Sequence, residues 1–334
     1  KRLYYYEQQR NVSVRQGHFS GYLYRLMTTA IPLPYRVFFG KDVDITHFFN
    51  YIIPPGVAGK RIVTVHDMVY KTFPETVRGR TRFMLESGLQ RSLHRADLIV
   101  TDSEFSKTEI IRYFPATEER IRVVPCGVDK LRFSPMPPAA APAIEELKRR
   151  MHLQANYFLY LGTLEPRKNL DRLIRAYALL KQQHPDAPQL VLAGGYGWRN
   201  HHIYQLVQTL HLEDDVLFTE YVPEEDVQPL LCGAMAFVFP SVYEGFGMPP
   251  LEAMACGTPV LTTRAASLPE VVGDAAVIVD PHHTEDIAQG LEKLFLDAAL
   301  RERLQKEGLR RAAMFSWENA AAALYNVYQE ALTR

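Results

Sequence analysis

The sequence has 334 residues, of which 47% are hydrophobic and 23% charged, and its formal net charge is zero. These are globular values, and the length exceeds the roughly 250 to 300 residues over which one core usually grows, so we expect two domains. No apolar run approaches the roughly 20 residues that a transmembrane helix needs, and the first residues lack the apolar block of a signal peptide. Three widely spaced cysteines favour neither a disulfide framework nor a metal cluster, so we expect a cytoplasmic protein.

Charge is distributed unevenly along the chain. Residues 1–148 contain 22 Lys and Arg against 15 Asp and Glu, and residues 149–334 contain 16 against 23. Close to this change of sign, the segment 133–146 is rich in proline and alanine, which is typical of a linker or hinge. We predict an N-terminal domain over 1–134, a linker over 135–150, a C-terminal domain over 151–315, and a helix over 316–334 that could return to the N-terminal domain.

In the first half, β-branched or aromatic runs alternate with helical patterns, which predicts a parallel sheet covered by helices. The candidate strands are 2–8, 45–50, 61–67, 98–103 and 121–127. A domain of this kind usually opens with a strand and a Gly-rich turn, whereas the segment before residue 45 is poorly patterned. We therefore expect the first strand-helix unit to be absent or disordered.

His66 and Asp67 end the candidate strand at 61–67. Ligands of doubly wound sheets bind outside the carboxyl ends of the strands, so His66 is a candidate site residue. The alternative is a core or turn histidine without a functional role. The Asp-x-Asp pattern at 42–44 precedes a strand, which puts it at the wrong end of the sheet for a metal-held diphosphate.

A predicted helix over 78–95 combines basic and apolar side chains. It could attract a membrane of anionic lipid. The more ordinary interpretation is a helix that packs by its apolar face and leaves its arginines in water. The basic residues are Arg78, Arg80, Arg82, Arg91 and Arg95, and the apolar ones are Phe83, Met84, Leu85, Leu89 and Leu93.

The second half alternates more regularly, with candidate strands at 158–163, 189–195, 216–221, 236–240, 259–263 and 275–280. Each of these strands is too apolar for a sheet that exposes one face to solvent. Between the first two lies a helix whose apolar residues, Leu170, Leu173, Ile174, Tyr177 and Leu180, share one face. We predict two doubly wound Rossmann-like domains facing across a cleft.

The loop at 163–169 places Arg167 and Lys168 beside the N-terminus of that helix. Two cations there oppose the helix macrodipole, and a bound diphosphate would resolve the conflict. The alternative is a basic loop in water. Gly194 and Gly195 end the next strand and could approach a nucleotide base, although ordinary turn chemistry also explains them.

Glu244 and Glu252 lie on either side of a Gly-Phe-Gly turn that follows the candidate strand at 236–240. Pro249 and Pro250 suit the first turn of a helix, so Glu252 is expected in that turn. The carboxylates could accept hydrogen bonds from the hydroxyl groups of a ligand, above a floor of backbone N–H groups. The alternative is that an acidic first turn only complements the helix dipole.

The motifs that define several other enzyme classes are absent from the sequence. No Gly-x-Gly-x-x-Gly follows a strand, and there is neither a P-loop nor a nucleophile elbow, which argues against dehydrogenases, kinases and α/β-hydrolases. The histidine pairs at 201–202 and 282–283 are adjacent and point apart on a regular element, so we expect no metal site. We expect no nucleic-acid partner.

Motifs in order over nearly the whole chain resemble those of family 4 glycosyltransferases of the GT-B fold, retaining enzymes that include bacterial mannosyltransferases of polysaccharide biosynthesis. The resemblance implies two domains that close over a nucleotide-diphosphate sugar. The motifs are TVHD at 64–67, RADLIVTDSEFSK at 95–107, VVPCGVD at 123–129, YLGTLEPRKN at 160–169, PSVYEGFGMPPLEAMACGTPV at 240–260, SLPEVVGDAAVIVDP at 267–281 and FSWENAA at 315–321.

The resemblance also implies roles for single residues. Lys168, with Arg167 beside it, would neutralise the diphosphate, and Glu252 would hold the ribose hydroxyls. Glu244 would contact the donor sugar, together with the amides of Phe246, Gly247 and Met248. Thr163 stands where many members carry arginine, so the phosphate would rest more on Arg167 and Lys168.

The same resemblance places Tyr221 and Val222 beside the base and lets His66 reach the sugar from the other domain. We therefore expect His66, Glu244 and Lys168 to be catalytic, with no metal and no cofactor. The expected donor is GDP-mannose or a UDP-sugar, and the acceptor is a glycan or a lipid-linked molecule at the inner face of a membrane. The alternative is a nucleotide-sugar-binding protein or inactive subunit without turnover.

Overall fold

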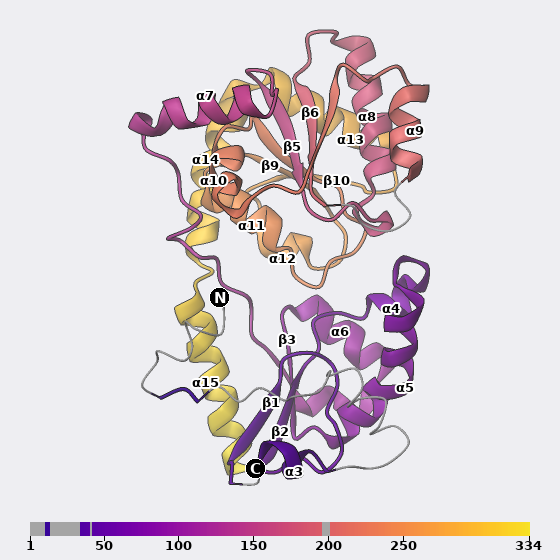
Figure 1. The fold of residues 1–334 in the computed structure, drawn as a ribbon, viewed down its shortest axis with the longest axis vertical. Coiled ribbons are helices and arrows are strands. Elements are labelled where there is room, and N and C mark those ends of the chain that lie inside the picture. The colour runs from indigo at the N-terminus through magenta and orange to yellow at the C-terminus, as the bar shows by residue number, and fades with distance from the viewer. Residues whose placement is uncertain (1–10, 14–33, 41, 196–200) are drawn as a thin grey trace.

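The computed structural model describes residues 11–13, 34–40, 42–195 and 201–334. The candidate strand at 2–8, and with it the expectation about a first strand-helix unit, lies outside these residues. Two α/β domains lie one above the other along the longest axis (Figure 1). Each contains a parallel sheet, which confirms the predicted fold class.

Among its described residues, the N-terminal domain has a four-stranded sheet in the order β1-β2-β3-β4. Leu98 and Ile99, adjacent in β3, point to opposite faces and enter two different cores, as the period of a strand requires. The strands are β1 (Ile45–Phe48), β2 (Lys60–Thr64), β3 (Leu98–Thr101) and β4 (Ile121–Val123), and the helices are α3 (Tyr35–Phe39), α4 (Val69–Thr72), α5 (Gly79–Arg95) and α6 (Glu104–Tyr113).

In the described part of the C-terminal domain, the sheet has six strands in the order β10-β9-β8-β5-β6-β7. Its strands are β5 (Tyr157–Leu161), β6 (Gln189–Ala193), β7 (Val216–Glu220), β8 (Ala236–Phe239), β9 (Val260–Thr263) and β10 (Val277–Val279). Its helices are α7 (Ala141–Arg150), α8 (Leu170–Gln183), α9 (His201–Thr209), α10 (Glu224–Cys232), α11 (Met248–Ala255), α12 (Leu268–Val272), α13 (Thr284–Leu296) and α14 (Ala298–Ala313). The strand order reverses between β5 and β8, which are direct neighbours.

Helix α8 confirms the pattern read from its sequence, because all five predicted face residues are buried. It begins after Asn169, which adopts the left-handed conformation with φ of 61°. The side-chain amide of Asn169 donates to the carbonyls of Pro240 and Pro281, at 3.1 and 2.8 Å. These bonds fix the start of α8 against the ends of two other strands.

The predicted linker over 135–150 is only partly a linker. Its second half is α7, which packs on α10 through the buried Leu147. Alanines favour a helix and Pro142 stands in its first turn, where a missing N–H costs nothing. The proline-rich segment before it is the part that joins the domains.

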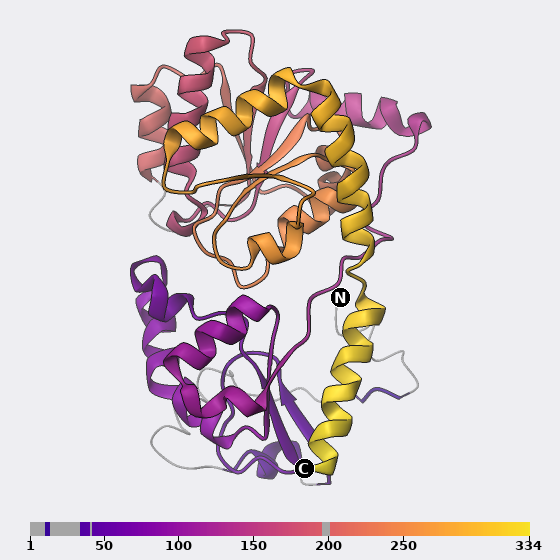
Figure 2. The same ribbon diagram turned by 180° about the vertical axis from the view of Figure 1, so that it is seen from behind.

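The chain crosses between the domains twice, and the two crossings lie side by side. Val128 forms a bridge with Ser316 at the start of α15 (Trp317–Thr333). A Cβ on Gly127 would lie 2.3 Å from the backbone nitrogen of Trp317, so only glycine fits there. Helix α15 then runs back along the N-terminal sheet (Figure 2), where Ala320, Val327 and Ala331 enter its core.

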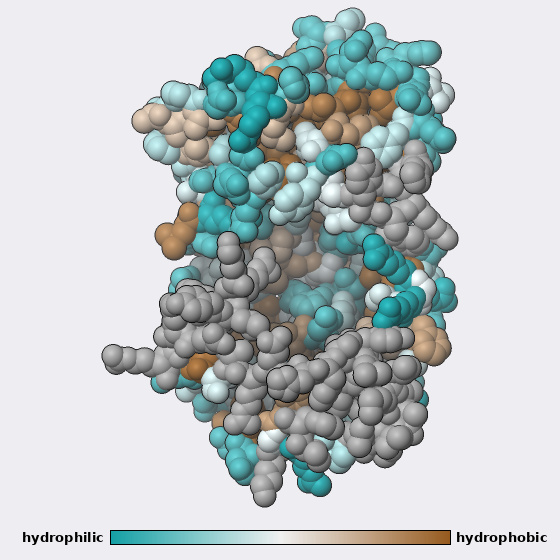
Figure 3. All heavy atoms as spheres, viewed as in Figure 1, coloured by the Kyte–Doolittle hydropathy of each residue, from teal (hydrophilic) through white to brown (hydrophobic). Residues whose placement is uncertain are grey.

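The space-filling view shows a surface hollowed between the two domains (Figure 3). Hydrophilic residues surround a hydrophobic area on the C-terminal domain in this view. Within the described residues, none of the helices has the length and apolar character needed to span a bilayer.

Candidate functional site

The sheet order of the C-terminal domain selects one place for a ligand. In an open parallel sheet, ligands bind beyond the carboxyl ends of the strands where the strand order reverses. Here that point lies between β5 and β8. The loops after these strands are 162–169 and 240–247, which contain the basic residues and the first glutamate predicted from the sequence.

Glu244 joins the two loops. Its Oε1 accepts hydrogen bonds from Lys168 Nζ at 2.7 Å and Ser241 Oγ at 2.6 Å, and its Oε2 accepts one from Arg167 Nη1 at 2.6 Å. Only 8% of Glu244 is exposed. Burial alone would raise the pKa of this carboxyl, but the charges of Lys168 and Arg167 hold it below its ordinary value, so Glu244 is ionised.

The two cations are neutralised within the site. Arg167 also donates to Glu165 from Nη2 at 2.7 Å and to the Tyr243 carbonyl from Nη1 at 2.9 Å. Lys168 is buried, and its Nζ lies 4.8 Å from the centroid of the Phe239 ring. Burial lowers the pKa of Lys168 in spite of the neighbouring carboxylate. The alternative of a basic loop in water is therefore wrong, because two carboxylates balance the two cations.

The Gly-Phe-Gly turn touches the other domain. Gly247 has φ of 120°, a value that favours glycine, whereas Gly245 is needed for space. A Cβ on Gly245 would lie 2.4 Å from the carbonyl oxygen of His66. The Gly245 carbonyl accepts hydrogen bonds from Ser103 and Ser106 at the start of α6, at 2.7 and 3.1 Å.

The turn leaves backbone donors available at the start of α11. Within the part of the chain that the structure describes, the amides of Phe246, Gly247 and Met248 donate no hydrogen bond. The carbonyls of Glu244 and Phe246 accept from Ser267 Oγ at 2.8 and 2.7 Å, which fixes the turn from behind. Unpaired amides at a helix N-terminus are suited to an anion.

Glu252 lies apart from this cluster. It is the fifth residue of α11, which begins at Met248, so its predicted place in the first turn is wrong by one residue. Burial raises the pKa of Glu252 to about 7, although the charge of Arg132, which directly precedes the proline-rich segment between the domains, acts to lower it. Arg132 pairs at 2.8 Å with Glu224, the first residue of α10. Glu252 therefore lies on the side of the site nearer to the hinge.

The remaining predicted site residues differ in whether their side chain or only their backbone is accessible to a ligand. Tyr221 is 75% exposed, while the side chain of Val222 is buried in the core, so Val222 offers only backbone. Gly194 has φ of 147°, and a Cβ there would lie 1.9 Å from the Gly162 carbonyl oxygen. The close packing of the backbone therefore explains why this position is a glycine. Gly195 has open space where a Cβ would be.

His66 approaches the site from the N-terminal domain. Its Nδ1 lies 2.7 Å from Asp102 Oδ2, and its Nε2 lies 2.9 Å from the Phe49 carbonyl oxygen. The neighbouring Asp67 accepts hydrogen bonds from the Val69 amide at 3.1 Å and the Tyr51 hydroxyl at 3.3 Å. The backbone carbonyl of His66 lies against Gly245, in the turn that carries Glu244, and Asp102 fixes the ring.

Two further contacts hold the domains together. The Met68 amide donates to the hydroxyl of Tyr243 at 3.0 Å. Glu270, in α12, accepts from the amides of Glu104 and Phe105 at the N-terminus of α6, at 2.9 and 2.6 Å. Both contacts tie the N-terminal domain to the segments that surround the Gly-Phe-Gly turn.

The sequence did not indicate roles for Asp102, Tyr243 and Glu270, or for Ser103 and Ser106 at the start of α6. A signal existed for Ser103, which caps α6 by accepting from the Ser106 amide, because serine before a helix is a typical N-cap. The long-range partners of the others, from 36 to 175 residues away, leave no local pattern.

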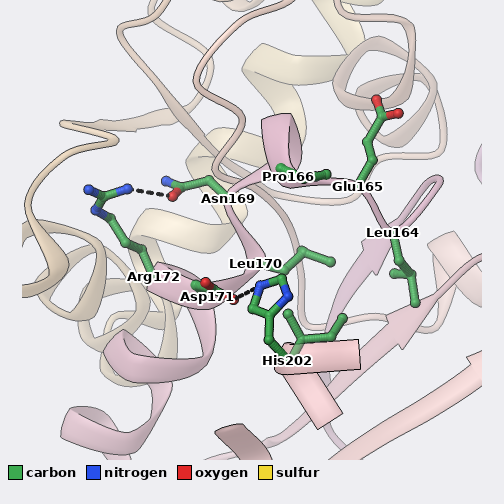
Figure 4. Close-up of a pocket in the computed structure, with 9 residues that line it drawn as sticks. Leu164, Glu165, Pro166, Asn169, Leu170, Asp171, Arg172 and His202 are labelled. Carbon is green, nitrogen blue, oxygen red and sulfur yellow. Dashed lines mark hydrogen bonds and ion pairs between the residues drawn. The ribbon is translucent and has the colours of Figure 1, made fainter. Parts of the chain in front are cut away.

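A small pocket of about 140 Å³ is lined by residues of the 162–169 loop and of helices α8 and α9 (Figure 4). His202 and Asp171 point toward one another there, with His202 Nε2 2.7 Å from Asp171 Oδ1, while Arg172 turns to Asn169. In the described ranges, no group of three or more His, Cys, Asp or Glu could hold a metal ion.

Two family models match the chain, one in each half. The model described as Glycosyl transferases group 1 matches residues 145–311, and the one described as Glycosyltransferase Family 4 matches residues 2–132. The sites described above fall within these two matches, with Glu244 and Lys168 in the first and His66 in the second.

Curated proteins and solved structures resemble the chain over most of its length. The O-antigen chain mannosyltransferase B of Escherichia coli is 38% identical over 288 residues, 85% of this chain and 74% of that protein. The serotype-specific mannosyltransferase WbdA of Escherichia coli is 32% identical over 79% of this chain, which spans only 33% of WbdA. Sucrose-phosphate synthase from Thermosynechococcus elongatus shares the fold, with a TM-score of 0.74 and 23% identity over 96% of this chain and 82% of that one.

Proposed function

The chain belongs to the family 4-type glycosyltransferases of the GT-B fold, and we propose that it transfers mannose from a nucleotide-diphosphate sugar to a glycan or lipid-linked acceptor. GDP-mannose is the proposed donor because two relatives are named as mannosyltransferases. A UDP-sugar is the second choice. Transferases among the relatives make a binding protein without turnover the weaker alternative.

The observation that carries this proposal is the buried cluster of Lys168, Arg167 and Glu244 beside the unpaired amides of the α11 N-terminus. A diphosphate is negatively charged, so it can form ion pairs with the two cations and accept hydrogen bonds from the amides. The carboxylates of Glu244 and Glu165 hold the cations in place before the donor arrives. Such fixed charges are effective in stabilising a leaving group, because they need no reorganisation during the reaction.

Glu244 has the second role of contacting the mannose. Its two oxygens already accept hydrogen bonds from Lys168, Arg167 and Ser241. A sugar hydroxyl that donates to Glu244 would replace or join one of these, while the cations turn toward the diphosphate. Glu244 thus links donor binding to the charge of the phosphate site.

The proposed reaction retains the configuration at the sugar carbon. The bond from this carbon to the diphosphate oxygen breaks, and the acceptor hydroxyl oxygen bonds to the carbon on the same face. The acceptor's proton passes to the leaving phosphate oxygen. Lys168, Arg167 and the amides of Phe246 and Gly247 meet the developing charge, so the proposal assigns no step to a metal.

The nucleotide is proposed to lie toward the hinge. Glu252 would accept hydrogen bonds from the ribose hydroxyls, and Tyr221, which is largely exposed, would pack on the base. Val222 and Gly195 would contribute backbone. Gly194 is not proposed to bind the donor. It allows the backbone after β6 to pack closely against Gly162, which follows β5, and so shapes this side of the site.

The acceptor is proposed to be reached at the inner face of a membrane, with the protein in the cytoplasm. Helix α5 supports this in part: Arg78, Arg82 and Arg91 are exposed and Phe83 is 72% exposed. Its leucines, however, are buried in the core, and Arg95 donates inward to the Ile53 carbonyl at 2.8 Å. Contact with anionic lipid would therefore involve a basic surface and one aromatic ring, without an apolar face.

Thermal shift with a panel of nucleotides tests the proposal. GDP and GDP-mannose are expected to raise the melting temperature more than UDP, UDP-glucose or ADP at the same concentration, because a ligand that binds only the folded protein stabilises it. Stabilisation by uridine nucleotides alone would reject the GDP-mannose assignment. No shift with any nucleotide would reject the donor site itself.

A further inference from the structure

Two histidines of the N-terminal domain lie on one cavity of about 360 Å³, beside α15. They have different partners. His47 Nδ1 lies 2.8 Å from the Tyr328 hydroxyl, and His47 Nε2 lies 2.8 Å from the Thr64 hydroxyl. Because a hydroxyl can donate or accept, a neutral imidazole satisfies both contacts.

His66 meets two acceptors instead. Its Nδ1 faces the carboxylate of Asp102 at 2.7 Å, and its Nε2 faces the Phe49 carbonyl at 2.9 Å. Neither a carboxylate nor a carbonyl oxygen can donate, and a neutral imidazole has only one N–H. Both contacts are hydrogen bonds only if the ring carries two protons.

We propose that Asp102 holds His66 as an imidazolium cation on the cleft side of the N-terminal domain, and that Asp102 is thereby a positioning residue for sugar transfer. The role in transfer depends on the proposed function, whereas the charge of the ring does not. The His66 carbonyl accepts from Ser106 Oγ at 3.0 Å and lies against Gly245, so the residue is fixed at the domain interface. The backbone of His66 is thus fixed against the turn after Glu244, while its ring lies on the cavity beside α15, between Asp102 and Phe49.

A doubly protonated ring can only donate hydrogen bonds. In this structure Nε2–H of His66 is occupied by the Phe49 carbonyl. An oxygen of a ligand in the cleft can replace that carbonyl, while Asp102 keeps its hold on Nδ1–H. The positive charge would attract the donor's diphosphate or stabilise an oxygen that gains negative charge.

The charged and titratable groups around the ring agree with this assignment. The hydrogen bond to Asp102 raises the pKa of His66 against the effect of burial, with Asp67 acting in the same direction. Burial, and then the charge of His66, lower the pKa of His47 to about 4, which leaves His47 neutral. The Tyr51 ring lies edge-on to His66, and burial raises the pKa of its hydroxyl, so Tyr51 adds no charge.

Cys126 is the remaining titratable group beside Asp102. Burial and the charge of Asp102 raise the pKa of this thiol to about 12, so it stays protonated and adds no charge. Within this group His66 carries the positive charge, and Asp102 and Asp67 lie beside it. Burial raises the pKa of Asp67, and the charge of Arg167, from the other domain, acts to lower it.

Nitrogen NMR of the histidine rings tests the protonation directly. With ¹⁵N-histidine in the full chain, His66 is expected to show two protonated ring nitrogens at pH 6.5 and a midpoint above 6.5, whereas His47 stays neutral. Signals are assigned with His66→Gln and His47→Gln. A wild-type His66 midpoint at or below 6.5 would overturn the proposal without any further variant.

Asp102→Asn and a matched control separate the charge of Asp102 from general effects. Asp97 directly precedes β3, whereas Asp102 directly follows it, and Asp97 pairs with Arg61 at 3.0 Å, so Asp97→Asn removes a carboxylate at the opposite end of the strand. Asp102→Asn is expected to lower the His66 midpoint by about one unit or more, and Asp97→Asn to leave it unchanged. Equal midpoints in the wild type and Asp102→Asn would contradict the proposal.

The role in transfer needs a second readout. If the imidazolium is used, the pH profile of mannose release from GDP-mannose falls at lower pH in Asp102→Asn than in the wild type, and Asp97→Asn keeps the wild-type profile. A shifted His66 midpoint with an unshifted activity profile would overturn the positioning role. If the wild type releases no mannose with or without a glycan acceptor, the proposed function fails, and the NMR titration still decides the charge of His66.

Discussion

The ammonium group of Lys168 donates to the carboxylate of Glu244 at 2.7 Å, and both residues are buried. The two residues are 76 positions apart and meet because β5 and β8 are neighbours in the sheet. Removing one member of a buried ion pair leaves the other charge without its counter-ion, which is costly.

Lys168→Met and Glu244→Gln are each expected to lower the free energy of unfolding by about 3 kcal/mol. The double variant should lose clearly less than the sum, because it leaves fewer unpaired charges. Urea denaturation of the four proteins gives the coupling. Glu165→Gln, which leaves the Lys168–Glu244 pair intact, is the control. Additive losses would show that the two residues do not interact.

Gly245→Ala is expected to separate the domains. Its Cβ would lie 2.4 Å from the His66 carbonyl oxygen, so the turn and the N-terminal domain must move apart. Small-angle scattering should show a larger radius of gyration, and mannose release should fall by about 100-fold, as expected from a displacement of about 1 Å in a site. In Gly79→Ala, at the start of α5, a Cβ meets nothing within 4 Å and both quantities should stay unchanged. Wild-type values in Gly245→Ala would mean that this contact does not set the closed arrangement.

Glu252 is expected to make donor binding depend on pH. Its pKa is about 7 in the folded protein, and only the ionised carboxyl accepts hydrogen bonds from both ribose hydroxyls. Calorimetry should therefore find tighter binding of GDP-mannose at pH 8 than at pH 6. Glu252→Gln should bind weakly at both values, with the exposed Glu225→Gln as control. Equal wild-type affinities at the two pH values would exclude Glu252 from the ribose site.

The raised pKa of Glu252 also predicts that the stability of the ligand-free protein falls with rising pH, whereas its affinity for the donor increases. Because burial raises the pKa of Glu252 above its value in the unfolded chain, its contribution to stability is complete below about pH 4.5 and is lost as the pH rises through about 7. Without ligand, Glu252→Gln should gain stability relative to the wild type between pH 5 and 8, by roughly 3 kcal/mol at most. A constant difference over this range would show that Glu252 is not buried in the free protein.

Membrane contact can be tested by sedimentation with anionic liposomes. The triple variant Arg78→Ala, Arg82→Ala, Arg91→Ala is expected to sediment less than the wild type, because each basic residue near such a surface contributes about 1 kcal/mol. Arg303→Ala, Lys306→Ala, Arg310→Ala removes the same charge from α14 and should sediment like the wild type. Equal recovery of the wild type and the α5 variant in the supernatant would reject the membrane proposal.

The strands and α8 could be predicted because their signals are local. An apolar run with turn residues at its ends defines β5 and β8, and the spacing of Leu170, Leu173 and Ile174 defines the buried face of α8. The expected position of Glu252 failed by one residue because α11 starts at Met248, before the prolines. A proline restricts the first turn of a helix but does not fix its first residue.

The pairing inside the site could not be predicted in the same way. Strand order is a property of the whole sheet, and the sequence contains no local sign that the loops after β5 and β8 meet. The sequence predicts an anion beside Arg167 and Lys168, and in this structure the carboxylate of Glu244 binds both cations. Space at Gly245 depends on His66, which belongs to the other domain.

Release of free mannose from GDP-mannose tests the central claim most directly, because a retaining transferase without its acceptor can pass the sugar slowly to water. We expect slow release by the wild type and none by Glu244→Ala, while Asp97→Asn, far from the site, behaves like the wild type. Tight binding of GDP-mannose by the wild type with no release of mannose, with or without a glycan acceptor, would contradict the claim and favour a binding protein.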